Sequence, residues 1–323
     1  MIQWGVIGTG MIIDMFCADF VEVEGANLHS VYGRRKERAE DIAKQYGFDH
    51  SFDDIDAFLA QDDLDVVYIG TPHNTHAEFA IKAMLAGKHV LCEKPFAVNE
   101  KEVQSILDTA NKSKKFVMEA LWTLYLPAVR KALEWVKADL IGDIRLITAD
   151  FGDTLSKDPK SRIRNPELAG GALLDVGIYP VLLSNAVMGT VPYCIKANAL
   201  MSDTGVDETT TMSFVYDKET TSTLGASVAV RTKWNAVIYG TKGSIEIPEF
   251  FRAKEAYLKT YEIEEHFIDK SPGLGYQHEA QAVTNLVAIG ALESKIVPHS
   301  FSLDLVRTLD QIRQEIGLRY PFE

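Results

Sequence analysis

The chain has 323 residues, of which 46% are hydrophobic and 24% charged, the size and composition of two domains with ordinary cores. A formal net charge of −13 argues against a nucleic-acid partner and against docking on anionic lipid, because both need a basic surface. Cys17, Cys92 and Cys194 form no C-x-x-C pair, so we expect reduced, mostly buried thiols and neither disulfides nor a structural zinc site. No membrane-length apolar run or signal-like N-terminus stands out, and we expect a cytoplasmic protein.

The first third of the chain alternates strand-like and helix-like segments. Apolar spacing predicts strands at 2–7, 27–32, 65–70, 88–92 and 116–119, with helices at 11–23, 34–46, 73–86 and 99–113. Asn99, with Glu102 three residues later, is a capping-box pattern that marks the start of the last helix. Such alternation predicts parallel β-α-β units, hence a doubly wound Rossmann sheet over residues 1–120.

The pattern changes after residue 120. Helices are predicted at 126–138 and 170–188, on either side of a strand at 143–152 and a polar loop at 156–167. Six strands then follow at 195–201, 209–216, 222–230, 235–239, 244–247 and 256–262, and two helices at 277–293 and 303–317. Turn residues such as Asp217-Lys218 favour antiparallel meanders. Residues 121–323 are therefore predicted to form an α+β domain that binds substrate, with a largely antiparallel sheet whose open face suits a homodimer.

A glycine turn lies between the first strand and the first helix. Gly8 allows the tight turn and Gly10 lets the backbone approach a pyrophosphate at the helix N-terminus. The predicted dinucleotide contacts here are Gly8, Thr9, Gly10, Met11 and Ile12. The third small residue of the fingerprint is replaced by Ile13, so close helix–strand contact must be relaxed or the helix must enter in another register.

The end of the second strand discriminates between cofactors. An acidic residue there would bind the ribose of NAD, but this chain has Gly33, followed by Arg34 and Arg35, with Arg38 one turn later. Guanidinium groups suit a 2′-phosphate, and the helix dipole disfavours cations at a helix start unless an anion is present. We therefore predict NADP, with NAD less favoured; a solvated basic helix start is the alternative interpretation.

Four ordered motifs span the chain: Thr71-Pro72-His73-Asn74-Thr75-His76, Glu93-Lys94-Pro95, Glu119-Ala120-Leu121-Trp122 and the segment from Gly170-Gly171 to Asp175-Val176-Gly177-Ile178-Tyr179-Pro180. Together they resemble the signature of the glucose-fructose oxidoreductase / inositol dehydrogenase / rhizopine catabolism family. Within it, the chain is similar to dimeric dihydrodiol dehydrogenases and NADP-dependent D-xylose 1-dehydrogenases, also in its ending Gly317–Glu323.

The resemblance implies roles for individual residues. Lys94 would lie beside the nicotinamide, with the following proline often cis. Asp175 and Tyr179 would face the substrate, and Trp122 would border its pocket. The remaining cofactor contacts implied by the motifs are Thr71, Pro72, His73, Asn74, His76 and Glu93.

The residues themselves support a proton-transfer site. Asp175 and Tyr179 are four apart on a predicted helix and project from one face. Oxidising an alcohol needs a base, and tyrosine, with a reference pKa of about 10, is a weak one alone. A lysine ammonium at about 4 Å would favour the phenolate by on the order of 4 kcal/mol and lower that pKa. In this scheme Asp175 orients the carbinol.

Other candidates have weaker support. Arg162 and Arg164, in the loop before Asp175, serve equally well as substrate contacts or as solvated loop residues, and Arg164 is taken as a substrate candidate. His278 and Glu279 suggest a metal, but no further ligands have suitable spacing, so no metal is predicted.

The sequence thus predicts an NADP-dependent dehydrogenase that acts on a sugar, polyol or trans-diol. The alternatives are a non-catalytic NAD(P)-binding regulator or redox sensor on the same fold, and an aldose–aldose oxidoreductase with tightly bound cofactor. We expect a small-molecule substrate, a homodimer or higher homo-oligomer, and neither nucleic-acid nor membrane partners.

Overall fold

The computed structural model describes residues 1–216 and 219–323, so the turn expected at Asp217-Lys218 lies outside the described residues. The chain forms two compact units. The N-terminal unit comprises Met1–Trp122 and Ser271–Leu303, and the C-terminal unit comprises Thr123–Lys270 and Asp304–Glu323. The sequence predicted a single domain boundary at residue 120. In the structure, each unit instead consists of two segments of the chain.

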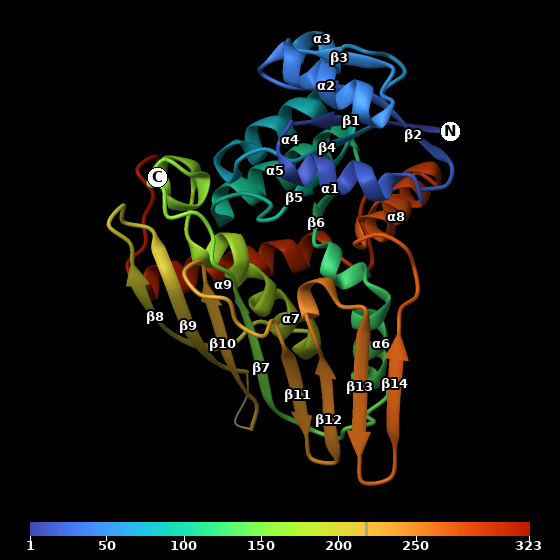
Figure 1. Cartoon of the computed structure of the whole chain (residues 1–323). Coiled ribbons are helices and arrows are strands. Elements are labelled where there is room, and N and C mark those ends of the chain that lie inside the picture. The colour runs from blue at the N-terminus through green and yellow to red at the C-terminus, as the bar shows by residue number, and fades with distance from the viewer. Residues whose placement is uncertain (217–218) are drawn as a thin grey trace. The chain divides into compact units, whose positions relative to one another are not determined.

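A six-stranded parallel sheet forms the core of the N-terminal unit, in the order β3-β2-β1-β4-β5-β6 (Figure 1). Its strands are β1 (Ile2–Ile7), β2 (Ala26–Tyr32), β3 (His50–Phe52), β4 (Val66–Ile69), β5 (His89–Glu93) and β6 (Val117–Ala120). The predicted doubly wound sheet is confirmed. The strand order reverses between β1 and β4, the place where such sheets bind ligands beyond their carboxyl ends.

The helices of this unit begin and end close to the predicted positions. They are α1 (Met11–Phe20), α2 (Lys36–Tyr46), α3 (Ile55–Leu59), α4 (His76–Leu85), α5 (Glu100–Ser113) and α8 (Tyr276–Ala288), and α9 (His299–Ile316) starts here. The capping box at α5 is present, because Asn99 Oδ1 accepts from the Glu102 N–H at 3.0 Å. The sequence missed β3 and α3, which are too short to show a clear apolar period.

Residues far along the chain complete the N-terminal unit. Asp19 on α1 accepts hydrogen bonds from the backbone N–H groups of Leu274, Gly275 and Tyr276 at the start of α8, at 2.7–3.0 Å. A carboxylate suits the positive end of a helix, so this contact fixes α8 against α1. The indole N–H of Trp4 donates to Thr284 Oγ1 of α8 at 3.2 Å. These contacts explain why residues 271–303 pack with the N-terminal residues.

An eight-stranded sheet dominates the C-terminal unit, in the order β14-β13-β12-β11-β7-β10-β9-β8 (Figure 1). Its strands are β7 (Ile144–Gly152), β8 (Cys194–Met201), β9 (Asp207–Val215), β10 (Thr221–Ser227), β11 (Ala236–Gly240), β12 (Gly243–Ile247), β13 (Glu255–Thr260) and β14 (Glu264–Ile268). All neighbouring pairs are antiparallel except β7 and β10, so the prediction of a largely antiparallel sheet is confirmed. Strand β14 was not predicted.

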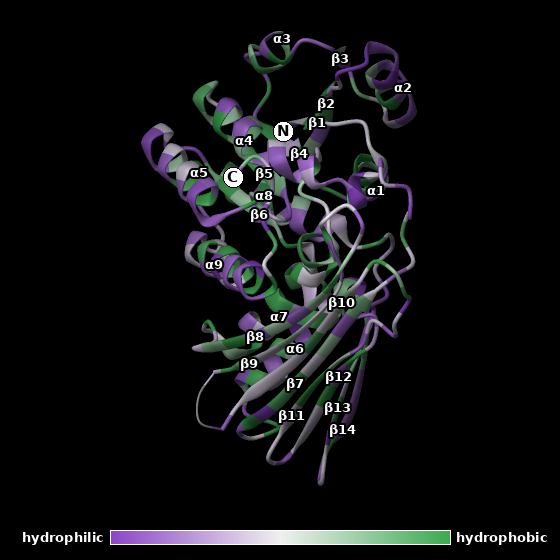
Figure 2. Ribbon diagram, turned by 90° about the vertical axis from the view of Figure 1, so that its left-hand side faces the viewer, coloured by the Kyte–Doolittle hydropathy of each residue, from purple (hydrophilic) through white to green (hydrophobic). Residues whose placement is uncertain are grey.

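Helices pack against this sheet, and hydrophilic residues alternate with hydrophobic ones along its strands. Helix α6 (Pro127–Lys137) contacts β12 and β13, and α7 (Ile178–Met188) contacts β7 and β10. Figure 2 shows hydrophobic and hydrophilic residues interspersed along these strands. In β9, Thr210, Met212 and Phe214 are buried, whereas Thr211 and Ser213 between them are exposed. This alternation is typical of a sheet with one covered face.

The helix predicted at 170–188 is two helical segments in the structure. A π-helical turn at Leu173–Gly177 leads directly into α7. The helical segment Pro166–Met188 is also long and apolar enough to span a membrane, because an 18-residue window within it has a mean hydropathy of 1.5, so the prediction that no such run exists is wrong. Because 89% of that window is buried inside the unit, we interpret it as the core helix of a globular fold.

Candidate active site

The glycine turn after β1 is shaped for close backbone approach. Gly8 has a φ of +129°, and a Cβ there would lie 2.6 Å from the Gly70 carbonyl oxygen, so only glycine fits. Gly10 precedes α1 with nothing within 4 Å of a Cβ position, and Met11 is exposed. The first N–H groups of α1 thus lie at an open helix start, as a pyrophosphate requires.

Ile13, the departure from the dinucleotide fingerprint, is accommodated by a glycine elsewhere. Ile13 is fully buried, and a Cβ on Gly70, directly after β4, would lie 2.5 Å from its Cδ1. In the usual fingerprint the small residue is on the helix, whereas here it is Gly70, directly after β4. This arrangement keeps helix and sheet close without moving the turn.

The end of β2 carries the predicted phosphate-binding arginines. Gly33 has no room for a side chain, because its Cβ would lie 2.5 Å from Thr9 Cγ2. Arg34 and Arg35 follow, both exposed, in the turn that immediately precedes α2. In the part of the chain that the structure describes, neither guanidinium has a hydrogen bond or ion pair, whereas Arg38 lies 3.8 Å from Asp41. Two cations at a helix start with no protein anion fit a bound phosphate.

A buried histidine connects the two turns that follow β4 and β5. His76 Nδ1 lies 2.8 Å from the Pro95 carbonyl oxygen, and its Nε2 lies 2.9 Å from that of Thr71. Two acceptors face the ring, so a neutral imidazole, with one N–H, can satisfy only one of them. Thr75 Oγ1 also bonds Thr71 Oγ1 at 2.8 Å and the Pro72 carbonyl at 2.7 Å. The motif therefore shapes backbone beside the Lys94-Pro95 turn.

That second turn contains a cis peptide bond between Lys94 and Pro95, as the family resemblance implied. Lys94 is half-buried at the end of β5. Glu93 is buried, accepts from the Tyr68 hydroxyl at 2.6 Å and from the Lys94 N–H at 3.2 Å. His73 is also buried, and Asn74 is half-buried in the same region of the unit.

Two further carboxyl groups lie buried in the same unit. Burial raises the pKa of Glu119 to about 7, although its Oε1 accepts from the Phe96 N–H at 2.9 Å. Burial likewise raises the pKa of Glu279 well above its usual range, and neither of its carboxyl oxygens has a hydrogen-bond partner among the residues that the structure describes. Burial in surroundings of low polarity disfavours the charged form of both groups.

Trp122, predicted to border the substrate pocket, stacks on Tyr276 with ring centroids 4.4 Å apart. Both rings are buried, at 3% and 4% exposed. Tyr276 begins α8, the helix fixed by Asp19. The sequence identified Trp122 but not this partner, which lies more than 150 residues away.

The C-terminal unit brings Asp175 and Tyr179 together with an arginine. Asp175 lies in the π-helical turn, and its Oδ1 accepts from Arg162 Nη2 at 2.6 Å. Tyr179 lies in the first turn of α7, beside the rings of Phe151 (5.4 Å) and Phe251 (5.5 Å), which stack on each other at 4.0 Å. Both predicted residues are nearly buried, at 8% and 7% exposed. π-helical turns are rare and frequent at functional sites, which fits this placement.

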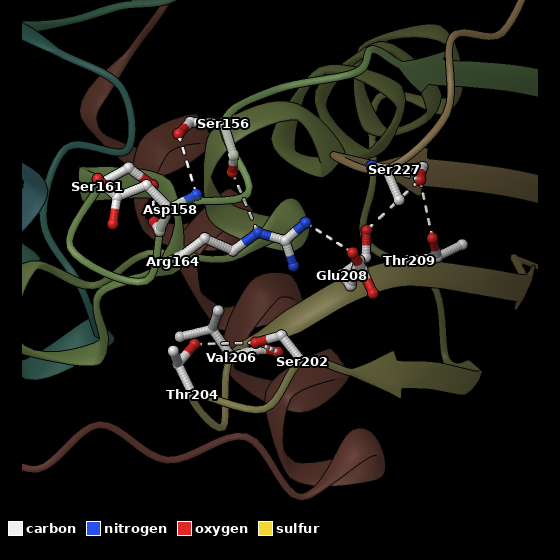
Figure 3. Close-up of polar contacts among 11 residues, drawn as sticks. Ser156, Asp158, Ser161, Arg164, Ser202, Thr204, Val206, Glu208, Thr209 and Ser227 are labelled. Atoms are coloured by element: carbon white, nitrogen blue, oxygen red, sulfur yellow. Dashed lines mark hydrogen bonds and ion pairs between the residues drawn. The ribbon is translucent and has the colours of Figure 1, made fainter.

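The other loop arginine has a structural partner. Arg164 is 5% exposed, and its guanidinium contacts Glu208 at 2.6 Å and the Ser156 carbonyl at 3.3 Å, as Figure 3 shows. Arg162, not Arg164, therefore contacts Asp175. A substrate role for Arg164 stays a prediction that none of these contacts supports.

Each unit thus contains some of the site residues that were predicted from the sequence. The N-terminal unit holds the glycine turn, the arginines, the two turns joined by His76, and Trp122; the C-terminal unit holds Asp175 and Tyr179. Sequence reasoning missed Phe151, Phe251 and Tyr276, whose only signal was their aromatic character. Within residues 1–216 and 219–323, no group of three His, Cys, Asp or Glu side chains is arranged to hold a metal ion.

Comparisons with known proteins agree with these features. The family model "Oxidoreductase family, NAD-binding Rossmann fold" matches residues 2–121, and the GFO/IDH/MocA C-terminal domain matches residues 129–246. The chain is 31% identical to trans-1,2-dihydrobenzene-1,2-diol dehydrogenase of Danio rerio, covering 99% of this chain and 98% of the relative. It is also 31% identical to the scyllo-inositol 2-dehydrogenase (NADP(+)) of Bacillus subtilis (strain 168), covering 99% of both.

Solved structures share the fold. An aldose-aldose oxidoreductase from Caulobacter crescentus superposes with a TM-score of 0.89 at 22% identity, covering 98% of this chain and 97% of that one. A 3-ketoreductase from Actinomadura kijaniata, solved with NADP and TDP-benzene, gives a TM-score of 0.88 at 23% identity, covering 98% of each chain.

Proposed function

Because this chain belongs to the GFO/IDH/MocA oxidoreductase family and is an NAD(P)-dependent dehydrogenase, we propose that it transfers a hydride between NADP and a CH–OH group of a sugar, polyol or trans-diol. The Bacillus relative is named for NADP, and the Danio relative for a cyclic trans-diol. A ring that carries vicinal hydroxyl groups is common to the named substrates of both relatives.

One observation carries the choice of NADP over NAD. Arg34 and Arg35 lie exposed just before α2, with no anionic partner in the described part of the chain, after a glycine where NAD enzymes place a carboxylate. Backbone N–H groups at the open start of α1 suit the pyrophosphate, and guanidinium groups suit the additional phosphate.

Replacing one arginine tests this assignment. Arg34→Ala should weaken NADP binding roughly 10- to 100-fold, the loss of a charged hydrogen bond, and leave NAD binding nearly unchanged. Lys44→Ala removes an exposed cation from the last turn of α2 and serves as the matched control. Titration of each variant with both nucleotides gives the dissociation constants, and equal weakening for NADP and NAD would contradict the proposal.

The side chains then have defined roles. When bound, the nicotinamide supplies the hydride acceptor. Tyr179 takes the proton from the substrate hydroxyl, and Lys94 favours the phenolate form that does so. Asp175, held by Arg162, accepts a hydrogen bond from a neighbouring hydroxyl and orients the carbinol. Flat aromatic rings beside Tyr179 suit the C–H face of a cyclic substrate.

A substrate panel tests the reaction itself. Incubation of the protein with NADP and a set of pyranoses, inositols and trans-diols should raise the absorbance of the reduced nicotinamide for at least one ring-shaped polyol. If no polyol, aldose or diol reduces NADP, the proposed substrate class is wrong.

Two alternatives remain distinguishable. An aldose–aldose oxidoreductase would carry its cofactor through purification, so nucleotide released on denaturing the pure protein would favour that activity. A non-catalytic sensor would bind NADP without turning over any member of the panel. Both relatives named above are enzymes, which favours the dehydrogenase.

We also propose that the C-terminal sheet mediates homodimerisation. Its strands carry exposed aromatic and aliphatic side chains, among them Leu200, Tyr239 and Tyr257. Light scattering at micromolar concentration should give twice the mass of the chain, and a monomer would contradict the proposal.

A further inference from the structure

The backbone that leads into the π-helical turn is contacted by a distant tyrosine. The Tyr320 hydroxyl donates a hydrogen bond to the Gly170 carbonyl oxygen at 2.7 Å, and Tyr320 is only 1% exposed. Gly170 itself has no room for a side chain, because a Cβ would lie 2.6 Å from the Arg162 carbonyl oxygen. Gly170 is thus enclosed between the loop that carries Arg162 and the Tyr320 ring.

Tyr320 is itself held on several sides. The guanidinium of Arg313 lies over its ring at 4.9 Å and forms an ion pair with the Glu323 carboxylate. The same carboxylate accepts from the Tyr320 N–H at 3.0 Å. Burial raises the pKa of the Tyr320 hydroxyl well above its usual range, so it remains a donor throughout the working pH range. The phenol therefore presents its proton to Gly170 from a fixed position.

A second buried side chain holds the next residues. Asp207, fully buried at the start of β9, accepts from the Leu173 N–H at 2.7 Å and from Thr210 Oγ1 at 2.6 Å. Gly171 has a φ of +121°, and a Cβ there would lie 2.2 Å from Asp207 Oδ1. The carboxylate thus occupies the space next to Gly171 and caps the first N–H of the π-helical turn.

Two residues after Leu173 comes Asp175, and one helical turn later Tyr179. We propose that Tyr320 and Asp207 are positioning residues, which fix Gly170–Leu173 so that Asp175 and Tyr179 are presented to substrate in one orientation. This inference rests on the proposed function, in which those two side chains act on the substrate. Hydrogen bonds of this kind matter because small displacements of reacting groups lower rates strongly.

Tyr320→Phe tests the inference, since it keeps the ring under Arg313 and removes only the hydroxyl. We expect kcat to fall about 10-fold while the dissociation constant for NADP stays unchanged. Tyr216→Phe is the matched control, because it removes another buried phenol hydroxyl, bonded to Ser184 at 2.8 Å and Asn185 at 2.9 Å in the second half of α7. The control should retain kcat; equal losses in both variants would indicate general destabilisation and overturn the inference.

A double-mutant cycle with Asp175→Asn separates positioning from stability. If Tyr320 acts through Asp175 as well as Tyr179, Tyr320→Phe should lower kcat in the wild-type background and have a smaller effect in the Asp175→Asn background. Full multiplication of the two losses would overturn the inference. Absence of turnover in the wild type would contradict the proposed function, wild-type turnover in Asp175→Asn would contradict the role proposed for Asp175, and wild-type turnover in Tyr320→Phe alone would contradict only the positioning role.

A second variant covers the case in which Tyr320→Phe does not fold. Glu323→Gln weakens the contact with Arg313 but keeps the hydroxyl, and should lower kcat about two- to five-fold. In the same variant, hydrogen exchange of the amides at 171–177 should accelerate more than that of the β11 amides. Unchanged exchange at 171–177 together with wild-type kcat would overturn the inference.

Discussion

The two units build their parts of the candidate site by opposite means. In the N-terminal unit, the candidate cofactor-binding turns depend on glycines. At Gly8, Gly33 and Gly70, a Cβ would clash with neighbouring atoms. In the C-terminal unit, Asp175 and Tyr179 depend on side chains that are present, Arg162 and a group of aromatic rings. One unit presents backbone N–H groups, and the other presents a carboxylate and a phenol.

The difference follows from the ligands each unit is proposed to bind. A pyrophosphate has the same shape in every dinucleotide, so a rigid backbone turn can recognise it. A polyol is recognised by its hydroxyl pattern, which calls for individually placed side chains. Substitutions should therefore act differently in the two units: atoms added to the first should damage packing, and atoms removed from the second should damage chemistry.

The largest effect is expected from removing one oxygen in the C-terminal unit. Tyr179→Phe deletes the proposed proton acceptor and keeps the ring beside the stacked Phe151 and Phe251, so kcat should fall about 10²- to 10⁴-fold. NADP affinity and the midpoint of thermal unfolding should change little. Steady-state kinetics and nucleotide titration check this, and retention of more than a tenth of the wild-type kcat would remove Tyr179 from its proposed role.

Glu119 tests the contrast between the two units, because it lies in the N-terminal unit but is expected to act through a buried side chain. Its pKa of about 7 in the folded chain exceeds the ordinary value of 4.5, so the folded state keeps a proton that the unfolded state releases between these values. Raising the pH through this window therefore lowers the stability of the wild type. Relative to Glu119→Gln, the loss should approach roughly 3 kcal/mol at pH 8 and vanish near pH 4.5.

Urea unfolding of both proteins from pH 4.5 to pH 8 measures this difference. Glu40→Gln, at an exposed position on α2, is the matched control and should show no such trend. A stability difference between wild type and Glu119→Gln that is the same at every pH would show that the carboxyl does not titrate in this window.

The smallest effect is expected from adding one carbon in the N-terminal unit. Gly70→Ala places a methyl group 2.5 Å from Ile13 Cδ1 and should destabilise the fold by about 1–3 kcal/mol. Adding Ile13→Val, which removes Cδ1, should restore part of the loss, because Ile12 Cγ2 would still lie 2.9 Å from the added methyl group. Gly10→Ala, where nothing lies within 4 Å, should leave the unfolding midpoint unchanged. A Gly70→Ala variant as stable as wild type would refute the packing explanation for Ile13.

The sequence predicted the parts of the site that are local in the chain. The turn Gly8–Gly10, the arginines after Gly33 and the capping box at Asn99 each depend on neighbours within a few residues, so their pattern is readable. The parallel, doubly wound sheet of the N-terminal unit followed from the alternation of strands and helices, whereas its strand order came from the structure. The sequence predicted that Ile13 would relax the helix–strand contact or shift the helix register. It could not show that Gly70, 57 positions later, makes room for the Ile13 side chain.

Long-range partners could not be predicted. Nothing in the sequence pairs Trp122 with Tyr276, or Gly170 with Tyr320, because such contacts depend on how distant elements pack. The choice between Arg162 and Arg164 also required the structure: the π-helical turn, which periodicity does not reveal, determines which guanidinium meets Asp175. The shared role proposed for Lys94 and Tyr179 stays a prediction.

The packing of residues 271–303 into the N-terminal unit has a consequence for biosynthesis. When a ribosome has released residues 1–122, the Asp19 carboxylate still lacks the N–H groups of α8, and Trp4 lacks its acceptor on Thr284. The nucleotide-binding unit therefore lacks residues 271–303 until residues 123–270 have been translated. A chaperone that shields α1 during this interval would protect the nascent chain at its most vulnerable stage.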